Sequence, residues 1–279
     1  MHTAQVTTWS QPPKYVSVPD LPAPAENEVQ IKVLASGLHN VVRSKASGTH
    51  YTSGPLPHYP GIDGVGLNTT NNELVYFSSF ATGGAMADYI NVPQHACCPV
   101  PAGLDAEQVA ALVNPGLSSW LSVKKRTSNL PQKFTAVVVG ATSASGALGA
   151  ELLRALGAGK VIGVARSAER LAGVVVDERV LLRDEVGETD YGGLDRVDLV
   201  LDYVYGPHAV HLLSTLKVEK PLQYAHIGAL GGELDMAIPG AILRGKDITV
   251  RGGGVGSWQM KDVIVETPLT LEAFKKNKK

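Results

Sequence analysis

The chain has 279 residues, of which 44% are apolar and 18% charged, and its formal net charge is −1. This length allows two domains with substantial cores, and the balanced charge excludes a disordered chain and a broad basic surface for nucleic acid. The two cysteines, Cys97 and Cys98, are adjacent, so they build neither a disulfide framework nor a Cys-x-x-Cys zinc pair. With no signal peptide or membrane-spanning run in the sequence, we expect a cytoplasmic protein without a nucleic-acid or membrane partner.

The first third of the chain has the pattern of a β-rich unit. Short apolar or alternating runs broken by Pro and Gly predict strands over residues 29–35, 61–67, 73–77 and 86–92. The pattern changes near Asp105, a helix-capping candidate, and predicts one helix over 105–113 and another over 117–126.

Apolar strands and helices then alternate to the end of the sequence pattern. Strands are predicted over residues 134–139, 160–165, 197–202, 222–228 and 247–252, with helices over 150–157 and 208–216. Fully apolar short strands separated by helices indicate a parallel sheet that is covered on both faces. The fold class is therefore α/β, with a β-rich domain followed by a doubly wound parallel sheet.

The stretch GATSASGALG, residues 140–149, lies between a predicted strand and a predicted helix. A dinucleotide turn needs glycine for the tight turn, small residues where the backbone approaches the pyrophosphate, and glycine where the helix packs on the strand. Gly140, Gly146 and Gly149 meet these needs, whereas Ser143 stands where the middle glycine is usual. Serine is small and adds a hydroxyl donor, so we expect it to weaken nucleotide binding little, unless the turn needs positive φ at this position.

Arg166 ends the second strand of this unit, twenty residues after Gly146. An acidic residue at that place would bind the ribose of NAD, whereas an arginine suits the 2′-phosphate of NADP. We therefore predict NADPH as the cofactor; the alternative is a surface arginine at a strand end.

Several segments in this order resemble the medium-chain dehydrogenase/reductase superfamily, and in particular its zinc-independent, quinone-oxidoreductase-like branch. They are VQIKVLASGLHNVVRSKASGTHY, LPHYPGIDGVG, MADYINVP, PVPAGLDAEQVAALVNPGLSSW, VVVGATSASG and LGAGKVIGVARS. The resemblance implies a GroES-like substrate domain over residues 1–115, a Rossmann NADPH-binding domain over 116–258 and a C-terminal segment over 259–279.

The positions that match the catalytic zinc ligands of the superfamily are His39, Ile62 and Pro115. Isoleucine and proline have no ligand atom, so a metal of that kind is not expected. His39 is interpreted as a polar residue in a cleft, and the pair His208 and His211 as residues at the surface or edge of a helix.

Without zinc, the resemblance implies hydride transfer from NADPH to a quinone or to an activated double bond of an enone or enal. Such a reaction needs a hydrogen-bond donor or proton source for the developing oxyanion. Tyr51 lies where the resembling reductases carry a tyrosine near the nicotinamide, and it is the predicted catalytic residue; a tyrosine packed under a loop is the alternative. His39, His50 and Asp63 are weaker candidates, and Asp63 is expected to support the fold.

The resemblance also implies a set of cofactor-binding residues from the five turns that follow these strands. They are Ser143, Ala144, Ser145, Gly146, Arg166, Ser167, Arg170, Tyr203, Gly228, Ala229, Gly253 and Gly254. The strand over 247–252 is expected at the sheet edge, where it would pair in a homodimer.

The sequence also departs from the resembling family near its C-terminus. After residue 266 it passes almost at once to TPLTLEAF, so we expect an internal piece and the last strand of the family to be missing. This leaves three hypotheses: an NADPH-dependent enzyme acting on a small molecule, a non-catalytic NADPH-binding redox sensor or interaction protein, and a nucleotide-free remnant.

Overall fold

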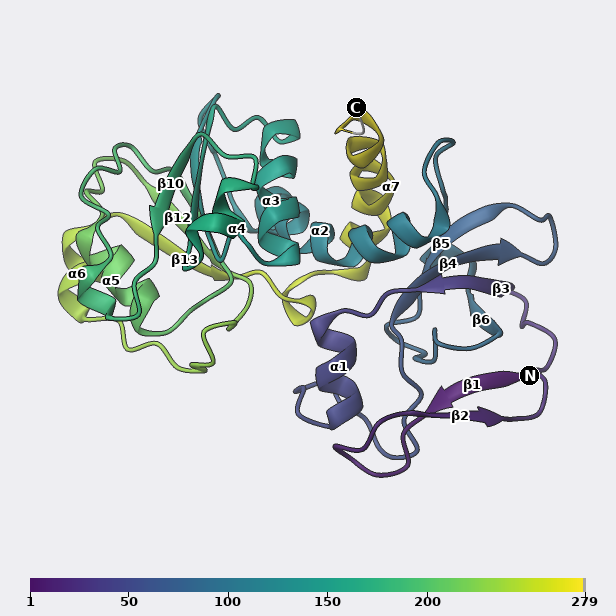
Figure 1. Cartoon of the computed structure of the whole chain (residues 1–279). Coiled ribbons are helices and arrows are strands. Elements are labelled where there is room, and N and C mark those ends of the chain that lie inside the picture. Colours follow the sequence, from purple (N-terminus) through teal and green to yellow (C-terminus); the bar gives the residue numbers. More distant parts are fainter. Residues whose placement is uncertain (278–279) are drawn as a thin grey trace. The chain divides into compact units, whose positions relative to one another are not determined.

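The structure is a computed structural model that describes residues 1–277 (Figure 1). It contains two compact units. The first comprises Met1–Asn114 and the chain from Thr267 onward, and the second comprises Pro115–Glu266. The predicted C-terminal segment, 259–279, forms the helix α7 (Met260–Asn277), and its residues 278–279 lie outside the described residues.

The first unit contains an antiparallel sheet with the strand order β6-β3-β4-β5-β7. Its strands are β3 (Glu28–Ser36), β4 (Asp63–Asn68), β5 (Leu74–Ser78), β6 (Tyr89–Pro93) and β7 (Cys97–Pro99). The short helix α1 (Asn40–Ser47) follows β3, and the 3₁₀ turn η1 (Gln94–Ala96) precedes β7. Apolar side chains that alternate along these strands, among them Ile31, Phe77 and Val92, are buried together, which confirms the predicted β-rich unit.

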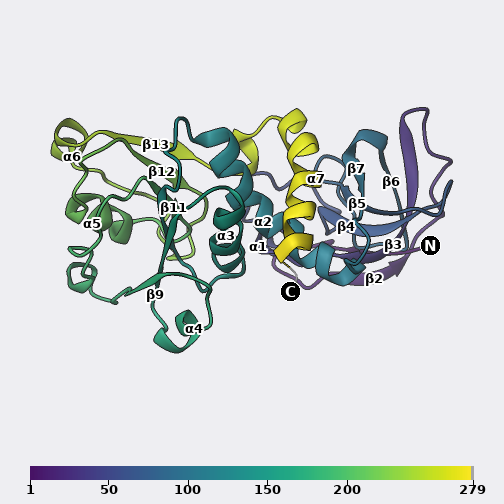
Figure 2. The ribbon, with the colours of Figure 1, turned by 90° about the horizontal axis from the view of Figure 1, so that it is seen from above.

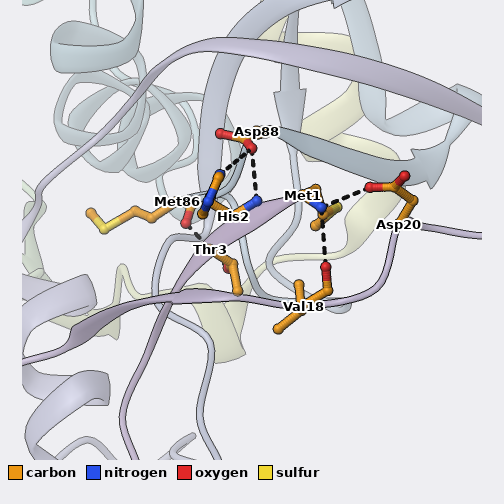
Figure 3. Close-up of polar contacts among 7 residues, drawn as sticks. All are labelled: Met1, His2, Thr3, Val18, Asp20, Met86 and Asp88. Carbon is orange, nitrogen blue, oxygen red and sulfur yellow. Dashed lines mark hydrogen bonds and ion pairs between the residues drawn. The ribbon is translucent and has the colours of Figure 1, made fainter.

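A separate two-stranded ribbon, β1 (His2–Gln5) with β2 (Lys14–Ser17), begins the chain. The terminal ammonium of Met1 donates to Asp20 Oδ1 at 2.7 Å and to the Val18 carbonyl at 3.0 Å (Figure 3). The backbone N–H of His2 donates to Asp88 Oδ2 at 2.7 Å. The bond to Asp88 ties the ribbon to the segment that enters β6.

Helix α2 (Ala106–Arg126) is one continuous helix with Pro115 inside it, so the prediction of two helices was wrong. A proline removes one helical hydrogen bond, which favoured a break at that point. Val113, Leu117 and Leu121 are nevertheless all buried, and their spacing of four residues carries one apolar stripe across the proline. The helix begins as predicted, since Asp105 Oδ1 accepts from the Gln108 N–H at 2.8 Å.

The described part of the second unit contains a six-stranded parallel sheet with the order β10-β9-β8-β11-β12-β13. Its strands are β8 (Thr135–Val139), β9 (Lys160–Ala165), β10 (Glu178–Leu181), β11 (Leu199–Asp202), β12 (Leu222–His226) and β13 (Ile248–Gly252). The connecting helices are α3 (Ala144–Ala155), α4 (Ala168–Ala172), α5 (Pro207–Thr215) and α6 (Gly240–Gly245), with 3₁₀ turns η2 (Val186–Glu188) and η3 (Val255–Ser257).

Alternate residues of each central strand enter two different cores. Val137 and Val139 of β8 pack with Leu212 of α5, whereas Ala136 and Val138 belong to the core that also contains α3. Figure 2 shows α3 on one side of this sheet and α5 with α6 on the other. The doubly wound sheet predicted from the alternation is therefore confirmed, and β13 lies at its edge as expected.

Within the second unit, the start of α7 is anchored on α2 by buried polar contacts. Trp120 Nε1 donates to Glu266 Oε2 at 2.7 Å, and Lys125 Nζ lies 3.0 Å from Glu266 Oε1. Because Glu266 is only 3% exposed, these contacts replace hydrogen bonds that its carboxylate would otherwise make with water.

Candidate functional site

The glycine turn follows β8 directly. Gly140 has φ +89°, a conformation that favours glycine, and a side chain there would meet Tyr203 Cβ at 3.2 Å. At Gly146, in the first turn of α3, a Cβ would lie 2.3 Å from the Gly140 carbonyl oxygen. The turn and the helix therefore approach each other so closely that only glycine fits at Gly146.

Ser143 is the N-cap residue of α3. Its φ of −75° is ordinary for serine, so the missing glycine causes no backbone strain. The hydroxyl accepts from the Gly146 N–H at 3.0 Å and donates to the Gly140 carbonyl at 2.8 Å. The serine thus stabilises the helix start, and its hydrogen is used inside the turn rather than offered to a ligand.

A pocket of about 600 Å³ adjoins this turn. It is lined by polar and apolar residues from the loops after β8, β9, β10, β11 and β12: Gly140, Thr142, Ser143, Ala165, Arg166, Ser167, Arg170, Leu182, Asp184, Val204, His208, Leu230 and Gly231. The carboxyl ends of parallel strands are where open α/β sheets bind ligands. The sheet grows from β8 toward β10 on one side and from β11 toward β13 on the other, and the pocket lies beside the point where this order of strands reverses.

Two arginines supply the positive charge of this pocket. Within residues 1–277, Arg166 makes no hydrogen bond or ion pair, whereas Arg170 Nη2 donates to the Thr142 carbonyl at 3.1 Å. Ser167 is the N-cap of α4 and accepts from the Arg170 N–H at 3.2 Å. The structure therefore brings the predicted residues Ser143, Arg166, Ser167 and Arg170 together, with Arg166 available for an anion.

His208 and Asp184 line the same pocket, and the sequence interpretation had not placed them there. Burial lowers the pKa of His208, as does the charge of Arg166, while the Asp184 carboxylate opposes both. The Nδ1 atom of His208 is buried and has no hydrogen-bond partner among residues 1–277. An unpaired cation and an unpaired ring nitrogen in one pocket fit a ligand that carries a phosphate and a polar ring.

The wall of the pocket at Val204 is held by a buried carboxylate at the end of β11. Asp202 Oδ1 accepts from the N–H groups of Val204 at 2.7 Å and Tyr205 at 3.1 Å, and Oδ2 accepts from the Tyr224 hydroxyl. Burial raises the pKa of Asp202, although these donors favour its charged form. This network fixes the loop after β11, in which Tyr205 has φ +67°.

Tyr203 was predicted to contact the cofactor, but its side chain lies elsewhere. It is 3% exposed, and its hydroxyl is hydrogen-bonded to Ser119 of α2. Ser119 in turn lies against Gly149, where an added Cβ would be 2.3 Å from its Oγ. Tyr203 therefore joins three elements of the interior, and its neighbour Val204 faces the pocket.

The remaining predicted cofactor residues are not among those that line the pocket: Ala144, Ser145, Gly146, Gly228, Ala229, Gly253 and Gly254. Leu230 and Gly231, two residues beyond the predicted pair in the loop after β12, line it instead. Gly253 is buried, and a Cβ there would lie 2.3 Å from Ser122 Oγ, which gives that glycine a packing role.

In the first unit, Tyr51 is 74% exposed and its ring stacks on His50 at 4.3 Å between centroids. Asp63, in contrast, is buried. Its Oδ2 accepts from the Tyr76 hydroxyl at 3.0 Å, and its Oδ1 lies 3.3 Å from His39 Nε2. Asp63 therefore supports the interior of this unit, and His39 is its partner.

In the part of the chain that the structure describes, no group of three or more His, Cys, Asp and Glu side chains is arranged to hold a metal ion. Over the same residues, no helix has both the length and the apolar character needed to cross a bilayer.

Known proteins resemble the chain over most of its length. The "Probable NADPH-dependent quinone reductase tdiC" of Emericella nidulans is 35% identical over 317 residues, which cover 96% of this chain and 88% of that protein. This alignment is longer than the chain's 279 residues, so the relative has internal residues that this chain lacks. The quinone oxidoreductase of Sus scrofa is 30% identical over 159 residues, covering 53% of this chain and 47% of that protein.

Solved structures agree with this similarity. The quinone oxidoreductase of Thermus thermophilus, also solved in complex with NADPH, has a TM-score of 0.76 at 26% identity and covers 99% of this chain and 86% of its own. The quinone oxidoreductase of Escherichia coli complexed with NADPH has a TM-score of 0.78 at 19% identity, and the match covers 99% of this chain and 86% of that one. At this identity the likeness is one of fold alone. No family model matches the chain.

The glycine turn on a doubly wound parallel sheet, in a chain that also contains a GroES-like antiparallel sheet, defines a dinucleotide-binding protein. The 35% identity of the Emericella relative, over 96% of this chain, also identifies the family. The chain belongs to the quinone-oxidoreductase-like branch of the medium-chain dehydrogenase/reductase superfamily. This confirms the family and the fold class predicted from the sequence.

Proposed function

We propose that the chain is an NADPH-dependent oxidoreductase that reduces a quinone, or the activated double bond of an enone or enal, without a catalytic zinc. The names of the relatives support the cofactor and the quinone. The enone and enal substrates rest on chemistry, because a quinone and an enone both accept hydride at a conjugated carbon and leave an oxyanion.

The observation that carries this proposal is Arg166. It directly follows β9 beside the glycine turn, lines the pocket, and makes no hydrogen bond or ion pair among residues 1–277. An unpaired guanidinium at this place matches the 2′-phosphate, which only NADPH carries, because arginine binds phosphate with two parallel hydrogen bonds.

The other residues of the pocket fit the rest of the dinucleotide. The N–H groups at the start of α3 would hold the pyrophosphate, and the small residues of the turn leave room for it. Leu182, Val204 and Leu230 supply an apolar surface suited to the adenine ring. When bound, the dinucleotide supplies a hydride from its nicotinamide ring.

Independence from zinc rests on the residues at the expected ligand positions. Ile62 is 3% exposed and packed in the interior, and Pro115 is part of the continuous helix α2. Neither offers a lone pair to a metal. Atomic emission of the active protein tests this statement: absence of zinc supports it, and one zinc ion per chain refutes it.

We further propose a homodimer that forms through β13. This strand is the sheet edge, and its Val250 is 41% exposed. An exposed apolar edge strand is a template for pairing with a second copy. Light scattering tests the proposal: a dimeric mass supports it, and a monomer across the accessible concentration range refutes it.

The activity is tested by titrating the purified protein with NADPH and with NADH, followed by NADPH oxidation with a panel of quinones, enones and enals. Tight NADPH binding, weaker NADH binding and steady turnover are expected. Tight binding without turnover would refute the enzyme in favour of a non-catalytic NADPH-binding protein. Failure to bind either nucleotide in a folded protein would refute both.

A further inference from the structure

The imidazole of His208 lines the nucleotide pocket of the second unit, and the proposed function gives it no role. Within residues 1–277, neither of its ring nitrogens has a hydrogen-bond partner; Nδ1 is buried, whereas Nε2 is not fully buried. A histidine with two unused ring nitrogens can gain or lose a proton without breaking a contact of the fold. The ring is therefore free to respond to the charge of a ligand in the pocket.

The turn before α5 fixes the backbone that carries this ring. Tyr205 and Gly206 both have φ +67°. A Cβ at Gly206 would lie 2.6 Å from Glu233 Cβ, so the turn requires glycine there. Pro207 then occupies the start of the helix, and its ring fixes its own φ. His208 follows directly, so its place in the pocket is set by the fold before any ligand binds.

Charged and titratable groups from several elements act on the imidazole. Burial has the largest effect and lowers the pKa of His208, and the Arg166 guanidinium after β9 and His211 on the same helix lower it further. The carboxylates of Asp184, after β10, and Asp202, at the end of β11, act in the opposite direction. Burial and Arg166 together favour the neutral ring as long as no anion offsets the guanidinium.

The charged side chains that line the pocket are two arginines and one aspartate, a net charge of +1 while His208 is neutral. A phosphate monoester carries nearly two negative charges at neutral pH, so a protonated ring would complete the match. We propose that His208 takes up a proton from solvent when a 2′-phosphate binds beside Arg166, and that NADPH, unlike NADH, therefore binds more tightly as the pH falls. This inference rests on the proposed function and makes His208 a specificity-determining residue of the same pocket.

The direction of these effects determines the pH window. In the empty pocket the ring is neutral above its lowered pKa, and a bound phosphate raises that pKa because a nearby negative charge favours the imidazolium. Between the two values binding takes up a proton, so the affinity increases as the pH falls. At higher pH the ring is neutral in both states, and at lower pH it is charged in both. The pyrophosphate is common to NADPH and NADH, so its effect cancels when the two are compared.

The test is calorimetry of NADP⁺ and NAD⁺ binding to the full chain at about pH 8 and at about pH 6.5, the ordinary pKa of histidine. The oxidised nucleotides serve as probes because they carry the same phosphates and survive in acid. From the higher to the lower pH, the preference for NADP⁺ should rise roughly three- to tenfold, the size of one solvent-screened charge pair. His208→Gln should abolish this rise, while it keeps the titration of the phosphate itself, which acts in the opposite direction near about pH 6. His95→Gln, at an exposed position of the first unit, is the matched control and should behave as the unaltered protein.

A second measurement needs no variant. Calorimetry of the unaltered protein in two buffers with different heats of ionisation should show more proton uptake with NADP⁺ than with NAD⁺. Equal uptake with both, a preference for NADP⁺ that does not change with pH, or a rise that persists in His208→Gln would overturn the inference, while tight NADP⁺ binding would leave the proposed function intact. If the folded protein binds neither nucleotide, the proposed function fails and the role of His208 with it.

Discussion

Replacing Arg166 by alanine should remove most of the preference for NADPH over NADH. A hydrogen-bonded contact with a charged group contributes about 1.5–3 kcal/mol. Arg166 is exposed and Arg170 stays in the pocket, so screening and the second arginine reduce the loss. We therefore expect the lower end, about 1.5–2 kcal/mol, which corresponds to NADPH binding weakened roughly 10- to 30-fold.

The assay is a fluorescence titration of both nucleotides against both proteins. The Kd for NADH should change less than about twofold, since NADH has no 2′-phosphate, and added salt should narrow the NADPH preference of the unaltered protein. Arg244→Ala, an exposed arginine on α6, is the matched control in the same unit. If Arg166→Ala weakens NADH as much as NADPH, the arginine supports the pocket as a whole and the reasoning is refuted.

The Asp184 carboxylate gives a second test of the same electrostatics, with the opposite sign. It lies in the pocket with Arg166 and would repel a phosphate dianion. Asp184→Asn should therefore tighten NADPH by a few-fold and leave NADH unchanged. Tightening of both nucleotides would place Asp184 against a part of the ligand that they share.

Three further predictions concern stability. Ser143→Ala should lower the free energy of unfolding by about 1 kcal/mol and Ser143→Gly by only a few tenths, because glycine is a tolerated N-cap; urea denaturation measures both, and equal losses would contradict the capping role. Glu266→Ala should cost about 1–3 kcal/mol by leaving the Trp120 N–H buried and unpaired, with Trp120→Phe, which removes that donor, rescuing part of the loss in the double variant. The Val161 N–H, which donates to Asp177 at 2.6 Å, lowers the pKa of Asp177 below its ordinary 3.8. Asp177 therefore stabilises the fold above pH 3.8, and this stability is lost as the pH falls through the lowered pKa. Asp177→Asn should reduce the loss of melting temperature at acid pH, and an unchanged pH dependence would contradict this reasoning.

The sequence predicted nine of the thirteen strands of the described residues and the position of the glycine turn, because these depend on local patterns, and it missed the short strands β1, β2, β7 and β10. Runs in which every second residue is apolar, or every residue is, indicate strands when Gly and Pro bound them, and this holds without knowing which strands pair. Pro115 shows the limit of such patterns. A proline ends most helices, but the burial of Val113, Leu117 and Leu121 keeps α2 continuous, and burial depends on residues far away in the sequence.

The sequence predicted most of the loops that line the pocket, but not always which of their side chains face it. That these residues bind the cofactor stays a prediction. Arg166 and Arg170 could be placed beside the glycine turn because the spacing between that turn and the end of the next strand is set by the βαβ unit itself, and both line the pocket. His208 was assigned to the surface or edge of a helix, since nothing local shows that the first turn of α5 meets the loop after β10. Only the order of strands in the sheet brings these two segments to one pocket.

There is a definite physical reason why Val204, and not Tyr203, faces the pocket. Successive residues of an extended chain point to opposite sides, so an error of one residue at a strand end exchanges the interior for the pocket. The sequence contained no means of choosing, because tyrosine suits a nucleotide surface better than valine does. The choice is made by Ser119 and Gly149. The serine hydroxyl binds the phenol, and the missing side chain at Gly149 leaves room for the serine. Which of the two neighbouring residues faces the pocket is thus determined by what the helices α2 and α3 require of the other.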